Sequence, residues 1–181
     1  STLRFSPDHY GLSIILGGAE GKLWDICGMY ASMARTLNHY TQYNGKYDPA
    51  DFHAPQYMEQ EKTAEPELEN TSIIDAASIY LTFEAMVEVS RPDEEAGWKY
   101  FTSANKVAWK TGTSFGFRDA WAVGVTPNYV VAVWVGNSDG EGRPGLVGIE
   151  AAAPIMFDVF NSLPKSAWFQ QPTTGFEEVD I

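Results

Sequence analysis

The run from Lys110 to Ser114 holds the residue types best suited to chemistry, in the order Lys110, Thr111, Gly112, Thr113 and Ser114. Lys110 supplies a positive charge that can hold hydroxyl groups in a proton-transfer network or attract an anionic substrate. Gly112 has no side chain, so a substrate acyl group and an attacking nucleophile can approach the backbone closely. The amide of Thr113 can then donate to the oxygen that becomes negative during attack on a carbonyl. The hydroxyl groups of Thr111, Thr113 and Ser114 can hydrogen-bond a substrate carboxylate.

A strand must present these residues, and the sequence predicts one. After residue 105 the apolar period changes from 3.6 to 2, which predicts strands over residues 106–114, 120–125 and 129–136. The connections at 115–119 and 126–128 are short enough for hairpins, so the strands are expected to be consecutive and antiparallel. The last strand is nearly all apolar, which predicts cover on both faces.

If the first strand lies at the edge of the sheet, it can add a substrate peptide as one more strand. The same residues also fit an ordinary amphipathic strand whose lysine stem lies along the surface. Residue types alone leave both interpretations open.

Helices are expected on either side of these strands. Apolar positions at three- and four-residue steps predict helices over 22–38, 71–90 and 149–162. Ser72 with Asp75 resembles a capping box at the start of the second helix, which Pro92 ends. That helix is apolar over much of its girth, so we expect it to be well buried. Helices packed on a three-stranded antiparallel sheet define an α+β fold.

The remaining segments are rich in breakers or polar residues. Glycines and Pro7 predict a loop over 1–21. Residues 40–70 mix scattered tyrosines with glutamates and predict a surface insertion with a solvated acidic end. Residues 164–181 predict an extended linker.

Composition limits the possible functions. The chain has 181 residues, of which 44% are hydrophobic and 20% charged, which is typical of one globular domain. Twenty-four acidic against twelve basic residues give a formal charge of −12, which argues against nucleic acid as a partner. No apolar run is long enough to span a membrane. The single Cys27 cannot form an internal disulfide and does not fix the compartment.

We expect no metal and no organic cofactor. His9, His39 and His53 are isolated, with no pair at ligand spacing. The glycine pattern from Gly140 to Gly145 follows an antiparallel strand, whereas a dinucleotide site requires a parallel βαβ unit. Cys27 falls on the apolar stripe of a helix, so a structural thiol is favoured over a reactive one.

The segments around these residues resemble a known family. Leu12–Leu23, leading into Tyr30–Ala34, is similar to the start of a helix in class A penicillin-binding proteins. Trp109–Ser114, Gly116–Pro127 and Val133–Gly136 resemble the lysine strand and following hairpin of their 1C subgroup. The resemblance covers about two thirds of the chain. Lys-Thr-Gly on a strand that opens a hairpin is also the motif of serine penicillin-recognising enzymes in general.

The resemblance implies a penicillin-binding-protein/β-lactamase-like fold and a peptidoglycan D,D-transpeptidase. Such an enzyme forms an acyl-enzyme on serine, releases the terminal D-Ala and transfers the acyl group to an amine of a neighbouring stem peptide. The implied catalytic residues are Lys110, Thr111, Gly112 and Thr113, with Thr111, Thr113 and Ser114 binding substrate. The implied partners are peptidoglycan stem peptides and β-lactam antibiotics.

Two further motifs of the family are missing. Ser103–Lys106 matches both patterns literally, but it leads into the lysine strand, so it cannot supply a nucleophile from a separate helix. Ser162–Lys165 also matches, but Pro164 forbids the helical spacing. We therefore expect residues 1–163 to be the C-terminal part of a transpeptidase domain whose nucleophilic serine lies upstream, and this chain alone to be inactive.

In that interpretation the rest of the transpeptidase domain is a partner of this chain. An upstream glycosyltransferase domain and membrane anchor would place it at the periplasmic face of the inner membrane, and residues 164–181 would lead toward a further domain. Two alternatives stay open. One is a serine β-lactamase or β-lactam sensor of the same fold, and the other is a non-catalytic interaction module.

Overall fold

A three-stranded antiparallel sheet forms the centre of the fold. The computed structural model describes residues 6–58, 65–90, 92 and 106–177. The strands are β1 (Ala108–Thr113), β2 (Asp119–Val125) and β3 (Val130–Gly136), in the spatial order β1-β2-β3. Their bounds lie within two residues of those predicted, and the α+β prediction is confirmed at this level.

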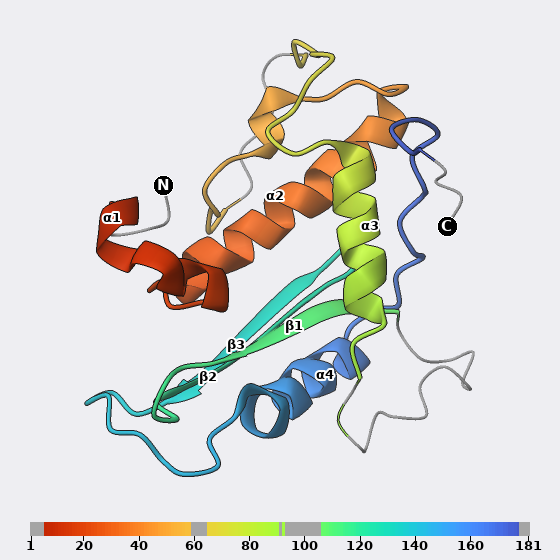
Figure 1. The fold of residues 1–181 in the computed structure, drawn as a ribbon. Coiled ribbons are helices and arrows are strands. Elements are labelled where there is room, and N and C mark those ends of the chain that lie inside the picture. Colours follow the sequence, from red (N-terminus) through yellow and green to blue (C-terminus); the bar gives the residue numbers. More distant parts are fainter. Residues whose placement is uncertain (1–5, 59–64, 91, 93–105, 178–181) are drawn as a thin grey trace.

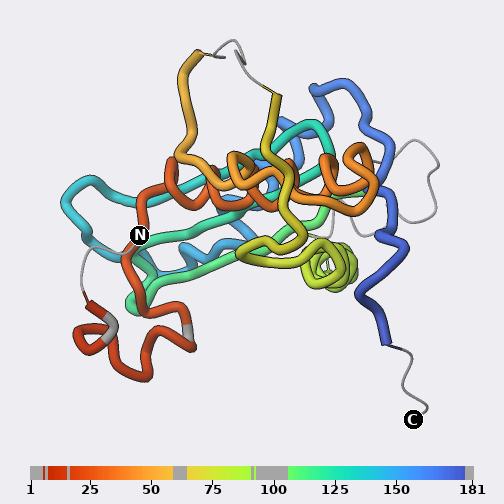
Figure 2. The backbone as a smooth tube through the Cα atoms, turned by 90° about the horizontal axis from the view of Figure 1, so that it is seen from above, coloured from red at the N-terminus to blue at the C-terminus, as the bar shows by residue number. Residues whose placement is uncertain are grey.

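Helices cover both faces of the sheet (Figure 1). Helices α2 (Leu23–Gln42) and α3 (Ala76–Val87) lie on one face. The short π-helix η5 (Gly148–Ala152) leads directly into α4 (Ala153–Ser162) on the other face. Seen from the α2 side, α2 runs lengthwise over the strands and α3 is viewed end-on (Figure 2).

Side chains alternate between two cores because successive residues of a strand point to opposite faces. Ala108 and Val125 join the core under α2 and α3, in which Phe83 is fully buried. Trp109 joins the core on the α4 side, where it packs edge-on against Phe157 with ring centroids 5.1 Å apart. The sheet is therefore held between two hydrophobic layers, and β1 contributes to both.

Several predicted elements differ from the structure. The loop predicted over 1–21 is wrong in part, because α1 (Pro7–Tyr10) and the 3-10 helix η1 (Gly11–Leu16) occupy it. Helix α3 begins later than predicted, because the carboxylate of Asp75 caps it by accepting from the Ser78 amide at 2.8 Å. The capping role assigned to Ser72 is therefore wrong.

The predicted burial of α3 is wrong, and that of β3 is incomplete. Helix α3 buries one face only, and Leu81 on its other face is 55% exposed. Strand β3 is half-buried along most of its length, and Trp134 is 38% exposed. Helix α2 packs against one face of β3, and α4 with η5 packs against the other, so the predicted cover of β3 on both faces is present but incomplete.

The expected surface insertion is anchored to the core at its start. Tyr40 and Tyr47 are buried with ring centroids 4.9 Å apart, and Tyr47 pairs its backbone with Glu69. The 3-10 helix η2 (Pro49–Asp51) follows, and Tyr57 beyond it is 91% exposed.

The segment after α4 is extended, as the sequence predicts, and it packs back onto the helices. Phe169 is buried against Phe83, and the hydroxyl groups of Thr174 and Tyr40 are 2.8 Å apart. Trp168 donates its indole N–H to Glu84 on α3. Of the helices that the structure describes, none combines the length and the apolar character that crossing a bilayer requires.

Candidate functional site

Strand β1 pairs with β2 alone in the described part of the chain, so its other side is a free edge. The Ser114 amide donates to the Asp119 carbonyl at 2.9 Å, which makes these two residues a hydrogen-bonded pair. Hydrogen-bonded and non-hydrogen-bonded pairs alternate along an antiparallel ladder. Gly112 is therefore bonded to β2, whereas the backbone N–H and C=O groups of Thr111 and Thr113 point toward the free edge.

Lys110 lies at the same edge. Its side chain is exposed, and Nζ donates to the carbonyl oxygen of Thr111 at 2.7 Å. Because that carbonyl points away from β2, the ammonium group stands over the free edge. The structure thus brings the lysine charge and the Thr113 amide to one side of β1.

Gly112 is a position at which the described fold does not require glycine. Its φ is not in the positive range. A Cβ added there would meet the Cβ of Trp121 at 3.6 Å, which is ordinary van der Waals contact. The clearance that the sequence assigned to Gly112 is therefore not used by the packing of the described residues.

The hydroxyl groups of the strand are partly engaged by the chain itself. Thr113 Oγ1 accepts from the Gly148 amide at 3.0 Å, and this bond ties β1 to η5. Ser114 Oγ accepts from the Asp119 amide at 2.8 Å within the hairpin. Each hydroxyl keeps its own proton for donation to a ligand. Substrate contact by Thr111, Thr113 and Ser114 stays a prediction.

The hairpin tip beside the edge is apolar and exposed. Phe115 is 99% exposed and Phe117 is 42% exposed, the latter at a φ of 55°. In the structure Asp119 Oδ1 accepts from the Trp134 indole N–H at 2.8 Å, so this carboxylate braces β2 against β3.

The rejected serine-lysine patterns can be followed in part. Ser162 is the last residue of α4, and its Oγ donates to the Val159 carbonyl at 2.7 Å. Lys165 follows in the extended segment, so no helical turn joins the two. Residues 103–105 of the other pattern lie outside the described residues. Burial raises the pKa of the Cys27 thiol, which disfavours it as a nucleophile.

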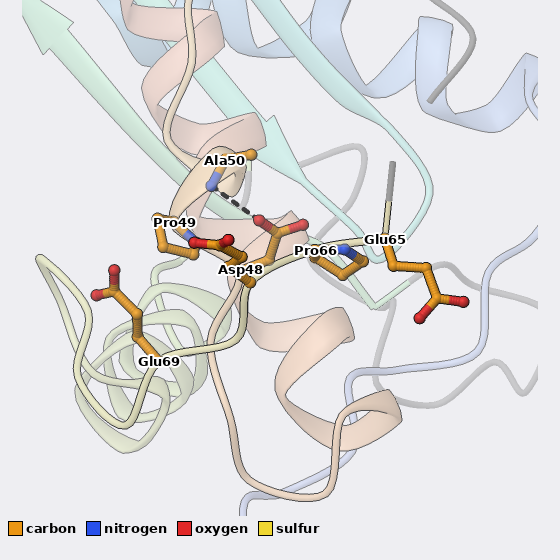
Figure 3. Close-up of a pocket in the computed structure, with 7 residues that line it drawn as sticks. Asp48, Pro49, Ala50, Glu65, Pro66 and Glu69 are labelled. Carbon is orange, nitrogen blue, oxygen red and sulfur yellow. Dashed lines mark hydrogen bonds between the residues drawn. The ribbon is translucent and has the colours of Figure 1, made fainter. Parts of the chain in front are cut away.

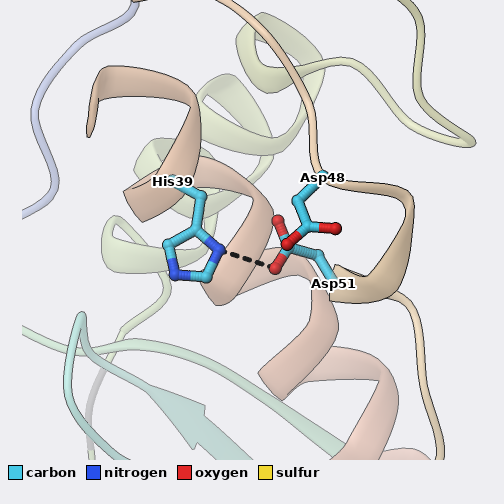
Figure 4. Close-up of side chains that lie close together, drawn as sticks. All are labelled: His39, Asp48 and Asp51. Carbon is cyan, nitrogen blue, oxygen red and sulfur yellow. Dashed lines mark hydrogen bonds and ion pairs between the residues drawn. The ribbon is translucent and has the colours of Figure 1, made fainter. Parts of the chain in front are cut away.

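A second group of functional side chains was missed by sequence reasoning. His39 near the end of α2, Asp48 before η2 and Asp51 within η2 bring their donor atoms within 4.8 Å of one another (Figure 4). His39 Nδ1 lies 2.7 Å from Asp51 Oδ1. Spacings of nine and twelve residues match no helical or strand period, so the sequence carried no signal for this cluster.

Arg35 fixes the backbone beneath the cluster. Its guanidinium donates to the Asp51 carbonyl oxygen from Nε at 3.1 Å and from Nη2 at 2.9 Å. Burial lowers the pKa of Arg35, and the negative charge of Asp51 raises it in part. The arginine therefore holds η2 against α2.

An acidic pocket opens beside Asp48 (Figure 3). Its volume is about 480 Å³, and segments 48–50 and 65–69 form its walls. Four of its lining residues carry carboxylates: Asp48, Glu65, Glu67 and Glu69. The backbone pairing of Tyr47 with Glu69 holds these two segments together. The pocket is not lined by β1, so it is separate from the free edge.

Comparison with known proteins supports the family relationship. The chain is 32% identical over 152 residues to penicillin-binding protein 1C of Escherichia coli strain K12. The match covers 84% of this chain and 17% of that protein. It supports a relationship with the penicillin-binding proteins. No protein-family model matches the chain, and no solved structure does.

Proposed function

We propose that this chain supplies the lysine strand of a peptidoglycan D,D-transpeptidase and that the free edge of β1 is the substrate-binding side. The observation that carries the proposal is the placement of the Lys110 ammonium and the Thr113 amide at one unpaired edge. The similarity to penicillin-binding protein 1C supports it. In this proposal residues 1–163 are the C-terminal part of the transpeptidase domain.

The reaction begins when a stem peptide lies along β1 and hydrogen-bonds to its free edge. A serine from the rest of the domain attacks the carbonyl carbon of the penultimate residue, and its proton passes to a base there. The carbonyl oxygen becomes an oxyanion that accepts from the Thr113 amide. Collapse expels the terminal D-Ala as an amine, which takes the proton from that base, and leaves an ester on the serine. An amine of a neighbouring stem peptide then attacks the ester, which forms the cross-link and frees the serine.

The other residues at this end of β1 have separate roles in the proposal. Lys110 stabilises developing negative charge and orients hydroxyl groups. Gly112 leaves room for the acyl group, and the hydroxyl groups of Thr111, Thr113 and Ser114 bind the substrate carboxylate. β-Lactams are proposed to occupy the same edge and to acylate the same serine. We place the complete protein at the periplasmic face of the inner membrane, with an upstream anchor and glycosyltransferase domain.

Labelling by a fluorescent penicillin tests the proposal in the complete protein that contains this chain. We expect covalent labelling of that protein and none of this chain alone. Lys110→Ala should slow acylation by at least about 100-fold, since electrostatic and proton-transfer groups at such sites have effects of this order. Lys165→Ala is the matched control, because Lys165 is exposed beyond α4.

The same experiment separates the alternatives. Rapid release of hydrolysed penicillin without peptide cross-linking would indicate a β-lactamase. Stable labelling without cross-linking would indicate a sensor. No labelling of the complete protein would indicate a non-catalytic module. Near-normal acylation of the Lys110→Ala protein would remove Lys110 from the site.

A further inference from the structure

His39, Asp48 and Asp51 combine three groups that ligate metals, contributed by two segments that pack face to face. The imidazole comes from α2, and the carboxylates come from Asp48 at the N-cap of η2 and Asp51 within it. Figure 4 shows the two carboxylates lying together beside the ring. One donor atom from each lies within 4.8 Å of the others. Asp48 is 6% exposed and Asp51 is 2% exposed, so neither carboxylate is an ordinary solvated surface acid.

One carboxylate oxygen in the cluster has no hydrogen-bond partner among the residues that the structure describes. Asp51 Oδ1 pairs with His39, whereas Oδ2 is buried and accepts no hydrogen bond from the described residues. The nearest arginine does not fill this role, because Arg35 directs its N–H groups to the backbone carbonyl of Asp51 and to Ser32 Oγ. A buried ionised carboxylate normally accepts at both oxygens. Asp51 Oδ2 is therefore available to coordinate a cation.

The charge of the described residues favours a cation. Among them, the carboxylates of Asp48 and Asp51 lie near the Arg35 guanidinium, and the acidic pocket beside Asp48 adds Glu65, Glu67 and Glu69 to the negative side. Walls of one charge sign raise the local concentration of the opposite ion. The pocket also gives solvent a route to Asp48 (Figure 3).

The donor set selects the kind of cation. One imidazole nitrogen with two carboxylate oxygens suits Zn²⁺, whereas Mg²⁺ and Ca²⁺ prefer oxygen ligands alone. Zn²⁺ holds its nitrogen and oxygen ligands at about 2.0–2.2 Å, so small movements of these side chains would close the site. We propose that His39, Asp48 and Asp51 bind a divalent cation of the Zn²⁺ type and thereby lock η2 onto α2. This site goes beyond the proposed function, because the pocket beside it is not lined by β1.

Calorimetric titration of the metal-stripped, untagged chain with ZnCl₂ tests the site. We expect one saturable site with a dissociation constant in the micromolar range or tighter, and a rise in the unfolding temperature on saturation. His39→Gln and Asp48→Asn should each weaken binding by at least about tenfold. Asp48→Asn keeps an oxygen for the Ala50 amide, which donates to Asp48 Oδ1 at 2.9 Å, so it tests the site even if His39→Gln unfolds.

His53→Gln is the matched control, because His53 is exposed and its Nδ1 contacts the Ala54 carbonyl oxygen instead of the cluster. It should bind Zn²⁺ as the unchanged chain does, and millimolar Mg²⁺ should not compete. The proposal is overturned if no saturable site is found, if Asp48→Asn binds as tightly as the unchanged chain, or if His53→Gln weakens binding equally. Competition by millimolar Mg²⁺ would also overturn it.

Discussion

Replacing Gly112 by alanine tests whether this position requires glycine for folding or for the close approach of a ligand. The added Cβ would lie 3.6 Å from Trp121 Cβ, and the backbone of Gly112 is not in the left-handed region. Alanine at a compatible position lowers the entropy of the unfolded chain and stabilises by about 0.4–1 kcal/mol. We therefore expect Gly112→Ala to leave the free energy of unfolding unchanged or to raise it by up to about 1 kcal/mol.

Gly124 on the adjacent strand is the matched control. A Cβ there would meet Phe160 Cε2 at 2.6 Å, Met156 Sδ at 2.9 Å and Val107 Cγ1 at 3.0 Å. Gly124→Ala would therefore overpack the core, which costs about 1–3 kcal/mol of unfolding free energy. Urea unfolding of this chain followed by circular dichroism measures both variants, and a shift in midpoint at constant slope gives the change in stability.

The effect of Gly112→Ala on acylation is measured in the complete protein that we propose contains this chain. Gly112→Ala should slow acylation by penicillin at least about tenfold while the protein stays folded, because the new methyl group occupies the clearance beside the acyl group. The reasoning is refuted if Gly112→Ala destabilises the chain as much as Gly124→Ala does. It is equally refuted if Gly112→Ala acylates at the normal rate.

Three further substitutions test contacts around the sheet. Thr113→Val should destabilise the chain by about 1–3 kcal/mol, because the Gly148 amide loses its acceptor, and chemical denaturation would detect this. Asp75→Ala should cost about 1 kcal/mol of unfolding free energy through loss of the α3 cap. Hydrogen bonds from the Ser78 amide and hydroxyl hold the pKa of Asp75 below its usual range. The difference in unfolding free energy between the unchanged chain and Asp75→Ala should therefore be full at neutral pH and shrink as pH falls below about 4. Lys106→Met should cost up to about 1 kcal/mol, because the partly exposed pair with Glu84 is lost, and added salt should reduce that cost. An unchanged unfolding midpoint in any of the three variants would show that the contact in question does not stabilise the fold.

The strands were predictable because their signal is local. After residue 105 the apolar period changes to 2 and two short connections divide the strands, so both hairpins followed from the sequence. The edge position of β1 was an expectation, and pairing with β2 alone in the described chain agrees with it. The direction of the Thr113 amide depends on the register, which placed Ser114 opposite Asp119.

Burial was harder to predict because composition does not show which face is covered. Leu81 and Trp134 are apolar, yet both are exposed in the described structure. The segment from Tyr40 to Asp51 shows the opposite error, because it was assigned to a surface insertion. Tyr40 and Tyr47 pack into the core, and Asp48 and Asp51 are buried.

The cluster of His39, Asp48 and Asp51 could not be found from spacing. Ligand motifs are recognisable when two ligands share a helical turn or a tight loop. Here a turn after α2 folds the chain back, and Arg35 fixes η2 by two hydrogen bonds to one backbone carbonyl. Tertiary contacts of this kind leave no periodic pattern.

The most direct test of the central claim is a crystal structure of the complete protein acylated by a penicillin. The account predicts that the acyl carbonyl oxygen accepts from the Thr113 amide at about 2.7–3.1 Å, with the ligand lying along the free edge of β1. An acyl group whose oxygen is held by other donors, with β1 not in contact with the ligand, would contradict it.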